Sequence, residues 1–207
     1  MNRALRNGLT LAAIAGICTA LVSGTFFFTE QRIEDNRQAY LERSLKPALA
    51  GLMYDSDVTE SVVVLETPHE LPGNEPALIY RVYSGDQPVA ALFAVSARDG
   101  YSGPIRVLVG IELDGRISGV RILEHRETPG LGDGIEHDKS DWDQQFLGRS
   151  LVDPGLDGWA IRRDGGEFDQ LSGASVTPRA VIGAVRDTLV WFDANRDSVF
   201  EMAETEL

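Results

Sequence analysis

Cysteine is almost absent from this chain, since Cys18 is the only one among 207 residues. A single thiol excludes an intramolecular disulfide, and it excludes a zinc or iron–sulfur cluster held by this chain alone. The sequence also lacks a His-Glu-x-x-His motif, a phosphate-binding P-loop and a Gly-x-Gly-x-x-Gly fingerprint. None of the histidines, His69, His125 and His137, lies in a recognisable hydrolase arrangement. We therefore expect no metal site and no self-contained catalytic centre.

Basic residues are scarce as well, with 19 Lys and Arg against 32 Asp and Glu, for a formal net charge of −13. This excess of negative charge argues against nucleic-acid binding, because phosphate recognition needs a basic surface. Apolar residues make up 43% of the chain, which is typical of a globular core. The length suits one domain of ordinary size with appendages.

Charged residues are missing altogether from residues 8–28, which are mostly apolar. About 20 such residues span a bilayer as a helix. Arg3 and Arg6 precede this run, and the next basic residue is Arg32. By the positive-inside tendency, residues 1–7 are predicted to be cytoplasmic, with a single membrane anchor after them and the bulk of the chain across the membrane.

A cleaved signal peptide is the alternative for the same segment. It would need small residues at a cleavage site, and no Ala-x-Ala stands around Ser23-Gly24. Three consecutive phenylalanines, Phe26 to Phe28, are instead typical of an interfacial anchor. Cys18 as a lipidation site is disfavoured, because Ile17 before it is bulkier than the small residue usual there. We therefore expect an uncleaved anchor.

The middle of the chain is predicted to contain a helical stalk followed by strands. Residues 29–59 form the stalk, because apolar residues alternate with charges up to Leu49, and the stalk either continues the membrane helix or packs on the domain. Residues 138–147 are expected to form a helix that buries Trp142 and Phe146. The stretches with strand-like patterns are residues 61–65, 77–83, 88–95, 105–113 and 117–123. Asp114-Gly115 between the last two is the strongest short-range signal for a hairpin.

A short stretch towards the end of the chain, residues 169–177, reads Asp-Gln-Leu-Ser-Gly-Ala-Ser-Val-Thr and precedes a predicted helix. Pro178 suits the first helical position, and Thr177 before it suits the cap. The one-sided apolar stripe of this helix consists of Val181, Ile182, Val185, Leu189 and Phe192. Unpaired backbone N–H groups and the helix dipole favour a phosphate at such a helix start.

The small residues of this stretch suit the same ligand. Gly173 and Ala174 let the backbone come close to a bound group, and Ser175 offers a hydroxyl that can react there. A capped helix after a turn is an equally simple interpretation, because small hydroxyl residues often precede helices. Local sequence alone leaves both interpretations open.

Residues 169–175, Asp-x-x-Ser-Gly-Ala-Ser, resemble the flavinylation motif Asp-x-x-(Ser/Thr)-Gly-Ala-(Thr/Ser) of FMN-binding subunits in redox-driven ion pumps. The wider run, residues 168–181, resembles the G subunit of the Rnf (Rsx) electron transport complex, which usually carries Thr at the last motif position. The resemblance implies a covalent FMN, attached through its phosphate as a phosphodiester to Ser175. Thr177 is the second-choice acceptor. A primary hydroxyl such as that of Ser175 is less crowded than a secondary one, so the attachment chemistry is compatible with serine.

The resemblance also assigns contacts around the acceptor. Ser172, Gly173 and Ala174 would surround the phosphate, and Asp169 would hold a metal ion that a flavin transferase uses during attachment. The loop at residues 127–132, Glu-Thr-Pro-Gly-Leu-Gly, matches the family, as does Gly-Tyr-Ser-Gly-Pro at residues 100–104. The implied FMN contacts in the first of these loops are Glu127, Thr128, Pro129, Gly130, Leu131 and Gly132. Taken alone, both loops are better explained as simple turns.

For the whole chain, the resemblance implies an α+β fold, in which an N-terminal transmembrane helix precedes a mixed or antiparallel sheet with flanking helices. Residues 60–195 would be a periplasmic FMN-binding domain on a bacterial inner membrane, and residues 196–207 an acidic tail. The implied function is electron relay through FMN within a ferredoxin- and NAD-linked, ion-translocating complex, whose other subunits are the partners. The chain would not be catalytic alone, because the cofactor carries the redox chemistry.

Two other interpretations remain open. The C subunit of the Na⁺-translocating NADH:quinone reductase shares the attachment motif, although Thr-Pro-Arg-Ala-Val at residues 177–181 and the loop at residues 100–104 favour Rnf. The other interpretation is a membrane-anchored interaction domain that has lost its flavin, and the feature that supports it is Ser175 in place of threonine.

Overall fold

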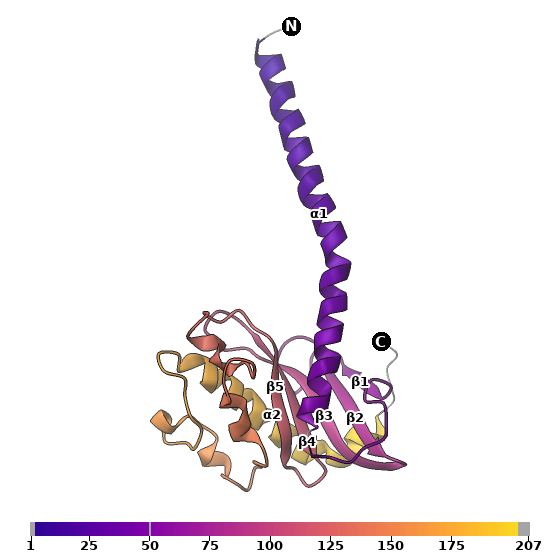
Figure 1. Ribbon diagram of the computed structural model, residues 1–207, viewed down its shortest axis with the longest axis vertical. Helices are drawn as coiled ribbons and strands as arrows, with labels where there is room; N and C mark the ends of the chain where they lie inside the picture. The colour runs from indigo at the N-terminus through magenta and orange to yellow at the C-terminus, as the bar shows by residue number, and fades with distance from the viewer. Residues whose placement is uncertain (1–2, 50, 203–207) are drawn as a thin grey trace. The chain divides into compact units, whose positions relative to one another are not determined.

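The computed structural model describes residues 3–49 and 51–202, and the chain divides into two compact units, Met1–Leu41 and Glu42–Leu207. The helix α1 (Arg3–Ala48) begins in the first unit and ends in the second (Figure 1). Residues 1–2, in the segment predicted to be cytoplasmic, and residues 203–207 of the predicted acidic tail lie outside the described residues.

The first unit contains the apolar part of α1. The stretch Arg6–Glu30 has a mean hydropathy of 2.0 and is long and apolar enough to cross a membrane. The predicted anchor, residues 8–28, lies within it, and the prediction of an N-terminal apolar helix is confirmed. Phe26, Phe27 and Phe28 are 63–77% exposed in this unit, as side chains that face lipid would be.

The second unit is built on one antiparallel sheet in which every strand pairs with its neighbour in the chain, in the order β1-β2-β3-β4-β5. The strands are β1 (Val62–Leu65), β2 (Ala77–Ser84), β3 (Gln87–Ala97), β4 (Ile105–Glu112) and β5 (Ile117–Glu124). All of them lie where the alternating apolar pattern predicts them, and Asp114-Gly115 forms the β4–β5 turn. The α+β fold is therefore confirmed, with the sheet antiparallel throughout.

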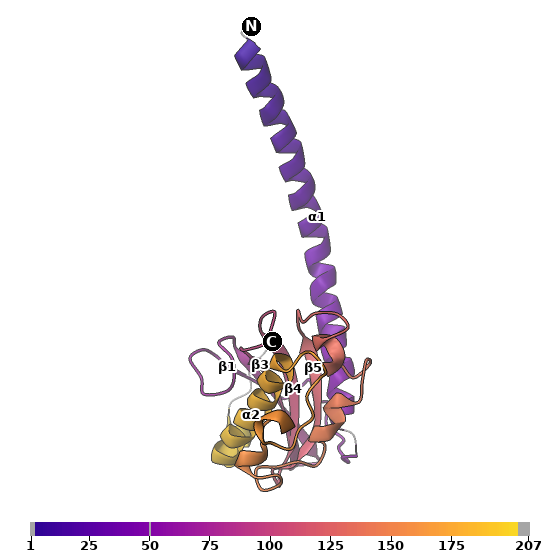
Figure 2. The same ribbon diagram turned by 90° about the vertical axis from the view of Figure 1, so that its left-hand side faces the viewer.

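One face of the sheet is covered by α2 (Val176–Glu201), which packs against β3 and β4 (Figure 2). The predicted apolar stripe of this helix is buried in the main core. Phe192 meets Phe93 of β3 edge to face, with ring centroids 5.8 Å apart. At the far end of α2, the buried Arg81 of β2 donates to the carbonyl oxygen of Met202 at 2.9 Å, which supplies a cation where the helix dipole favours one.

The opposite face of the sheet receives the last turns of α1. Leu45, Ala48 and Leu49 are buried there, so this part of the predicted stalk packs on the domain. Gly110 and Gly119 are cross-strand partners whose missing side chains leave room for the helix end, and Ser118 Oγ donates to the carbonyl oxygen of Ala48 at 2.7 Å. The glycine pair therefore fixes where the chain enters the sheet.

We expect the Gly110→Ala variant to be less stable than the wild type by about 1–3 kcal/mol, because overpacking forces backbone shifts. A Cβ at this position would lie 2.6 Å from the carbonyl oxygen of Ala48 and 2.4 Å from Ser118 Oγ. Urea unfolding of the full chain in detergent measures the effect. Gly183→Ala is the matched control, because a Cβ there meets nothing within 4 Å and alanine favours the helix. Equal stability of the Gly110→Ala variant and the wild type would refute this packing argument.

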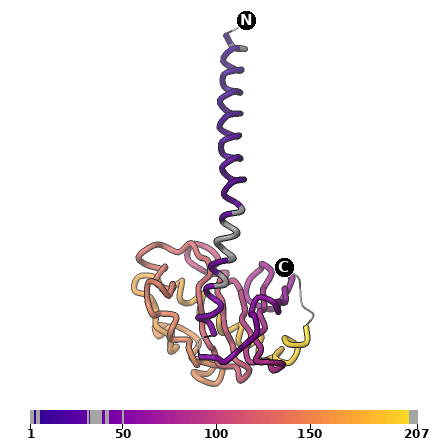
Figure 3. The backbone as a smooth tube through the Cα atoms, turned by 45° about the vertical axis from the view of Figure 1, so that its right-hand side comes forward, coloured from indigo at the N-terminus to yellow at the C-terminus, as the bar shows by residue number. Residues whose placement is uncertain are grey.

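The stretch between β5 and α2 is irregular and lies beside the sheet, as the orange part of the tube in Figure 3 shows. Its short 3₁₀ helices are η1 (Gly132–Ile135), η2 (Trp142–Phe146), η3 (Leu156–Gly158) and η4 (Arg162–Asp164). The helix predicted over residues 138–147 is wrong in length and type, because only η2 forms there and Gly148, with a φ of +73°, follows it. Trp142 and Phe146 are nevertheless buried as expected.

The start of α2 also differs from the prediction. The helix begins at Val176 with Ser175 as its N-cap residue, so Thr177 is not the cap. The reason lies in tertiary structure, because the Thr177 hydroxyl donates to the carboxylate of Glu127 and is not used for capping. At its other end α2 continues to Glu201, into the segment predicted as an acidic tail.

Candidate functional site

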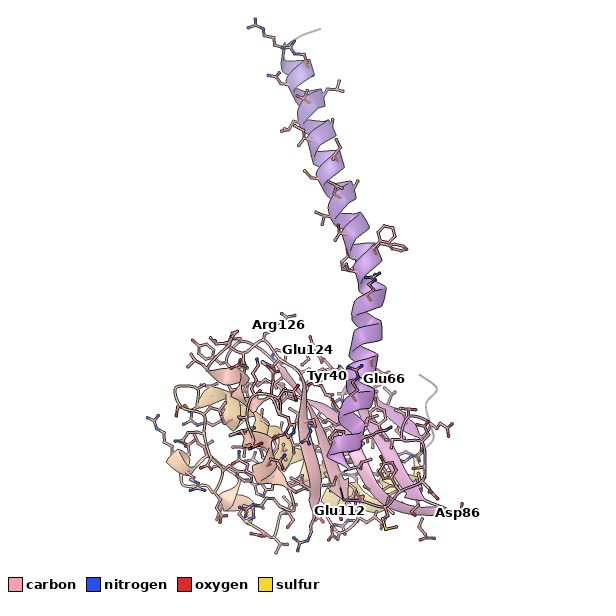
Figure 4. All side chains as sticks on the ribbon, viewed as in Figure 1. Tyr40, Glu66, Asp86, Glu112, Glu124 and Arg126 are labelled. Carbon is pink, nitrogen blue, oxygen red and sulfur yellow. The ribbon has the colours of Figure 1, made fainter. Side chains whose placement is uncertain are left out.

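A pocket of about 350 Å³ lies where the β3–β4 connection, the loop after β5 and the start of α2 meet. Figure 4 labels Glu124 and Arg126 at this end of the sheet, and Glu112 and Asp86 at the opposite end. The pocket is lined by Tyr101, Glu127, Thr128, Leu131, Gly132, Gly173, Ala174, Ser175, Val176 and Thr177. Two stretches that are separated by about 40 positions in the sequence, both singled out as flavin contacts, thus form one cavity.

The pocket does not include every residue that the sequence singled out. Pro129, Gly130, Ser172 and Asp169 are not among its lining residues. Gly130 has a φ of +77°, a left-handed conformation that suits glycine in the turn before Leu131. The Asp169 carboxylate forms an exposed ion pair with Arg162 at 2.9 Å, and its backbone carbonyl accepts a hydrogen bond from Trp142 Nε1 at 2.6 Å.

The two hydroxyls considered as flavin acceptors have different surroundings. Ser175 is partly exposed, lines the pocket and caps α2 by position, and its Oγ accepts a hydrogen bond from Arg179 Nη1 at 3.2 Å. Thr177 is fully buried, and its hydroxyl donates to Glu127 Oε2. A buried hydroxyl that is bonded to a carboxylate is poorly placed to react with a group outside the protein.

Glu127 is the buried charged group at the base of the pocket, with 4% of its surface exposed. Its Oε2 accepts from Thr177 of α2, and its Oε1 accepts the backbone N–H of Ser102 at 2.9 Å. Both carboxylate oxygens therefore accept hydrogen bonds, and the side chain connects all the segments that form the pocket. A Cβ at residue 132 would lie 2.9 Å from the Glu127 Cβ, so this close approach requires Gly132.

A network of charged side chains supports the loop beneath the pocket. His125 Nδ1 accepts the backbone N–H of Glu127 at 3.0 Å, which makes Nε2 the protonated nitrogen that donates to Glu136 at 2.9 Å. Lys139 pairs with Asp133 at 2.7 Å and with Glu136 at 3.0 Å. The hydrogen bond from Lys139 lowers the pKa of Asp133 below its usual value. Burial raises the pKa of Glu136, but the hydrogen bonds from Lys139 and His125 have a larger combined effect. The pKa of Glu136 is therefore also lower than its usual value.

These shifts predict an acid-dependent contribution to stability. A carboxyl whose pKa is lower in the folded state stabilises the fold above its unfolded-state pKa, and this stabilisation is lost as the pH falls through the folded-state pKa. The Lys139→Ala variant should therefore differ most from the wild type near neutral pH, and the difference should shrink below the ordinary Asp133 pKa of 3.8. Urea midpoints of both proteins between neutral and acidic pH measure this.

Arg98→Ala is the control, because the exposed Arg98 donates to an uncharged group, Asn74 Oδ1, at 3.2 Å, away from the network. It should leave the pH dependence unchanged. A difference between the Lys139→Ala variant and the wild type that stays constant with pH would contradict the ionic role of Lys139.

The composition of the pocket fits a flat, phosphate-bearing cofactor. Tyr101, Leu131 and Val176 are exposed at its rim, at 72%, 47% and 40%, and present apolar surface that a ring system can cover. The start of α2 places backbone N–H groups and the positive end of the helix dipole beside Ser175. Among the described residues, no group of His, Cys, Asp and Glu side chains is arranged to hold a metal ion. Sequence reasoning did not assign Tyr101 and Val176 to the site, although it singled out the loop that contains Tyr101.

Two family models match the chain. Residues 100–190 match the FMN-binding domain, and residues 1–47 match the RnfG N-terminal region. The first match contains every residue that lines the pocket, and the second covers the apolar segment of α1.

Curated relatives are similar over almost the whole chain. The G subunit of the ion-translocating oxidoreductase complex of Pseudomonas aeruginosa is 44% identical over 97% of this chain and 94% of the relative. The protein of the same name from Pseudoalteromonas atlantica is 40% identical over 94% of this chain and 91% of the relative. That from Shewanella amazonensis is 39% identical over 95% of this chain and 91% of the relative.

Among solved structures, the fold is similar to the C subunit of the Na⁺-translocating NADH-quinone reductase of Parabacteroides distasonis. The TM-score is 0.54 at 12% sequence identity, and the match covers 84% of this chain and 98% of the other. At so low an identity the similarity concerns the fold alone.

Proposed function

We propose that this chain, which belongs to the RnfG family, relays electrons through a covalently bound FMN. The members of this family are the G subunits of ion-translocating oxidoreductase complexes, and the chain would act in such a complex as a membrane-anchored flavoprotein. The observation that carries the proposal is the pocket that joins the Ser-Gly-Ala-Ser stretch to the Glu-Thr-Pro-Gly-Leu-Gly loop. Its rim is apolar, and part of its wall is the start of a helix beside an accessible hydroxyl. These are the features that hold a ring system by one end and a phosphate by the other.

Ser175 is the proposed attachment residue. Ser175 lines the pocket and is partly exposed, whereas the Thr177 hydroxyl is buried against Glu127. Attachment as a phosphodiester to Ser175 would place the phosphate at the start of α2, where backbone N–H groups favour it. Gly173, with a φ of +78°, brings the backbone close to Leu131, so a larger residue there would be strained and would crowd the pocket.

FMN, when bound, supplies the electron-transfer chemistry, and the residues of this chain bind, orient and shield it. Leu131 and Tyr101 would contact the ring system from the pocket rim, and Thr128 would contribute a hydroxyl at its wall. The Glu127 carboxylate would keep the two loops and α2 together while it places a negative charge at the base of the pocket.

The partners follow from the same family. The other subunits of the complex would exchange electrons with this chain, which would act as one relay in electron flow between ferredoxin and NAD coupled to ion movement. The positive-inside pattern supports a cytoplasmic N-terminus and a periplasmic flavin domain behind a single membrane crossing. A covalent bond is useful in that location, because a flavin lost from the periplasm cannot be replaced from the cytoplasmic pool.

A flavin transferase is the proposed partner during maturation, and Asp169 is the proposed residue through which a metal ion of that reaction is held. The Asp169 side chain is exposed and pairs with Arg162 at the surface. The Asp169→Ala variant should therefore be folded but poorly loaded with flavin. Normal flavin incorporation in this variant would remove the proposed role of Asp169.

In-gel fluorescence tests the proposed function. The full chain is produced together with a flavin transferase, denatured, separated by electrophoresis and viewed under ultraviolet light. Fluorescence that remains on the band after denaturation is the expected result, because only a covalent flavin survives. A dark band from protein that was exposed to active transferase would favour an interaction domain without flavin. The C subunit of the Na⁺-translocating reductase has a similar fold, but the relatives at 38–44% identity favour the RnfG family.

A further inference from the structure

Arg179 lies one helical turn after the proposed acceptor, and its guanidinium connects two different groups. Its Nε and Nη2 atoms pair with the two carboxylate oxygens of Asp164, and the Nη2–Oδ1 distance is 2.9 Å. The remaining nitrogen, Nη1, lies 3.2 Å from Ser175 Oγ. The guanidinium is planar and carries donors on fixed edges, so a bidentate partner on one edge sets the direction of the other edge.

Asp164 is well placed to hold this orientation. It ends the 3₁₀ helix η4, and Gly165 after it has a φ of +91°. The hydrogen bond from Arg179 lowers the pKa of the Asp164 carboxyl, so Asp164 stays ionised at neutral pH. Both side chains are partly exposed, with 42% and 37% of their surfaces accessible, so this pair by itself contributes little to stability. Its geometry therefore points to a role other than holding the fold together.

We propose that Arg179 is a positioning residue for the flavin phosphate, with Asp164 as the anchor that aims its Nη1 edge at Ser175. This inference rests on the proposed function. In the free protein, the Nη1 donor orients the Ser175 hydroxyl. In the flavinylated protein, the same nitrogen donates to a non-bridging oxygen of the phosphodiester and balances its single negative charge. Asp164 remains bound to the other edge, so the arginine need not move between the two states.

The chemistry of the attachment step explains why a cationic group beside Ser175 would be needed. FMN itself is a phosphate monoester, so forming a diester requires a donor with an activated phosphate, such as a flavin dinucleotide with a phosphoanhydride bond. The Ser175 Oγ–phosphorus bond forms while the anhydride bond breaks and a nucleoside monophosphate leaves. The hydroxyl proton passes to a base of the transferase, because Arg179 is a donor and cannot accept it. Arg179 would stabilise the negative charge on the phosphoryl oxygens during this transfer.

Arg186 provides a matched control on the same helix. It lies two turns further along α2, pairs with Asp187 at 2.7 Å and is exposed to a similar degree. Both arginines line a neighbouring groove and neither lines the pocket that contains Ser175, but it is Arg179 whose Nη1 lies 3.2 Å from Ser175 Oγ. The Arg186→Gln variant therefore removes one surface cation from α2 without changing the surroundings of the acceptor hydroxyl.

The test measures the initial rate of flavin incorporation into purified full-length protein by a transferase supplied with flavin adenine dinucleotide. Arg179→Gln should slow incorporation by roughly tenfold or more, since it removes a charge-assisted hydrogen bond to the phosphate. Arg179→Lys should fall between this variant and the wild type, because lysine keeps the charge but not the fork. Asp164→Asn should also slow incorporation, and Arg186→Gln should not.

A second measurement excludes a merely structural role. In protein that has been loaded to completion, the ³¹P resonance of the phosphodiester should shift in the Arg179→Gln variant and stay in place in the Arg186→Gln variant. Wild-type rates and an unchanged resonance for Arg179→Gln would overturn the proposal. If the wild-type protein did not take up flavin, that result would instead count against the proposed function. The experiment therefore distinguishes failure of the role of Arg179 from failure of the proposed function.

Discussion

Replacing Ser175 by alanine is expected to leave the chain without covalent flavin. Ser175 is partly exposed and lines the pocket, whereas Thr177 is fully buried and bonded to Glu127, so Thr177 cannot take its place as acceptor. The full chain should fold normally, because Ser175 makes no capping hydrogen bond at the start of α2. Intact mass after production with the transferase measures the loss.

Two variants complete this experiment. Ser175→Thr should still be flavinylated, since it restores the residue that the family usually carries. Ser172→Ala should also be flavinylated, because Ser172 is exposed and does not line the pocket. Covalent flavin on the Ser175→Ala variant would show that the acceptor has been misassigned.

Replacing Glu127 by alanine is expected to destabilise the flavin domain by roughly 3 kcal/mol, because removing one partner leaves buried groups unsatisfied. The variant would leave the Thr177 hydroxyl and the Ser102 N–H without their partner in the wall of the pocket. It would also remove the side chain around which Gly132 is packed. Urea unfolding of the full chain in detergent, followed by tryptophan fluorescence, measures the change.

The Glu127→Gln variant shows how much of the stability at this position depends on the negative charge and how much on the shape of the side chain. Its amide oxygen can accept from Ser102 and its amide nitrogen can donate to the Thr177 oxygen, so it should lose clearly less stability than Glu127→Ala. If the alanine variant were as stable as the glutamine variant, the role of Glu127 in joining the loops to α2 would be wrong.

The strands could be predicted because each one has a strand-like apolar pattern within its own residues. Residues 105–113 and 117–123 alternate around Asp114-Gly115, and the structure pairs β4 with β5 across that turn. The same local information explains the apolar stripe of α2. Strand order was not predictable, although each strand proves to pair with the next one in the chain.

The start of α2 was predicted two residues too late because the sequence does not show which group the Thr177 hydroxyl bonds. That group, Glu127, is 50 residues away in the sequence. Likewise, the pairing of Arg179 with Asp164 depends on how the segment of 3₁₀ helices folds back beside α2, and no periodic pattern encodes that. Most of the residues that line the pocket could be named from motifs, while the contacts between them required the fold.

The antiparallel sheet explains why two distant motifs form one site. The connection before β4 and the loop after β5 leave the sheet at the same end, since β4 and β5 run in opposite directions. The irregular stretch with its aromatic core then returns the chain so that α2 begins beside them. Trp142 is part of this return, because its indole N–H donates to the carbonyl oxygen of Asp169, the first residue of the acceptor motif.

Peptide mass spectrometry tests the central claim most directly. Trypsin cleaves after Arg163 and Arg179, which gives one peptide of residues 164–179 that contains Ser172, Ser175 and Thr177. The account predicts that this peptide from the transferase-treated full chain is heavier by one FMN minus one water, with the fragment ions placing the addition on Ser175. An unmodified peptide, or an addition on Ser172 or Thr177, would contradict it.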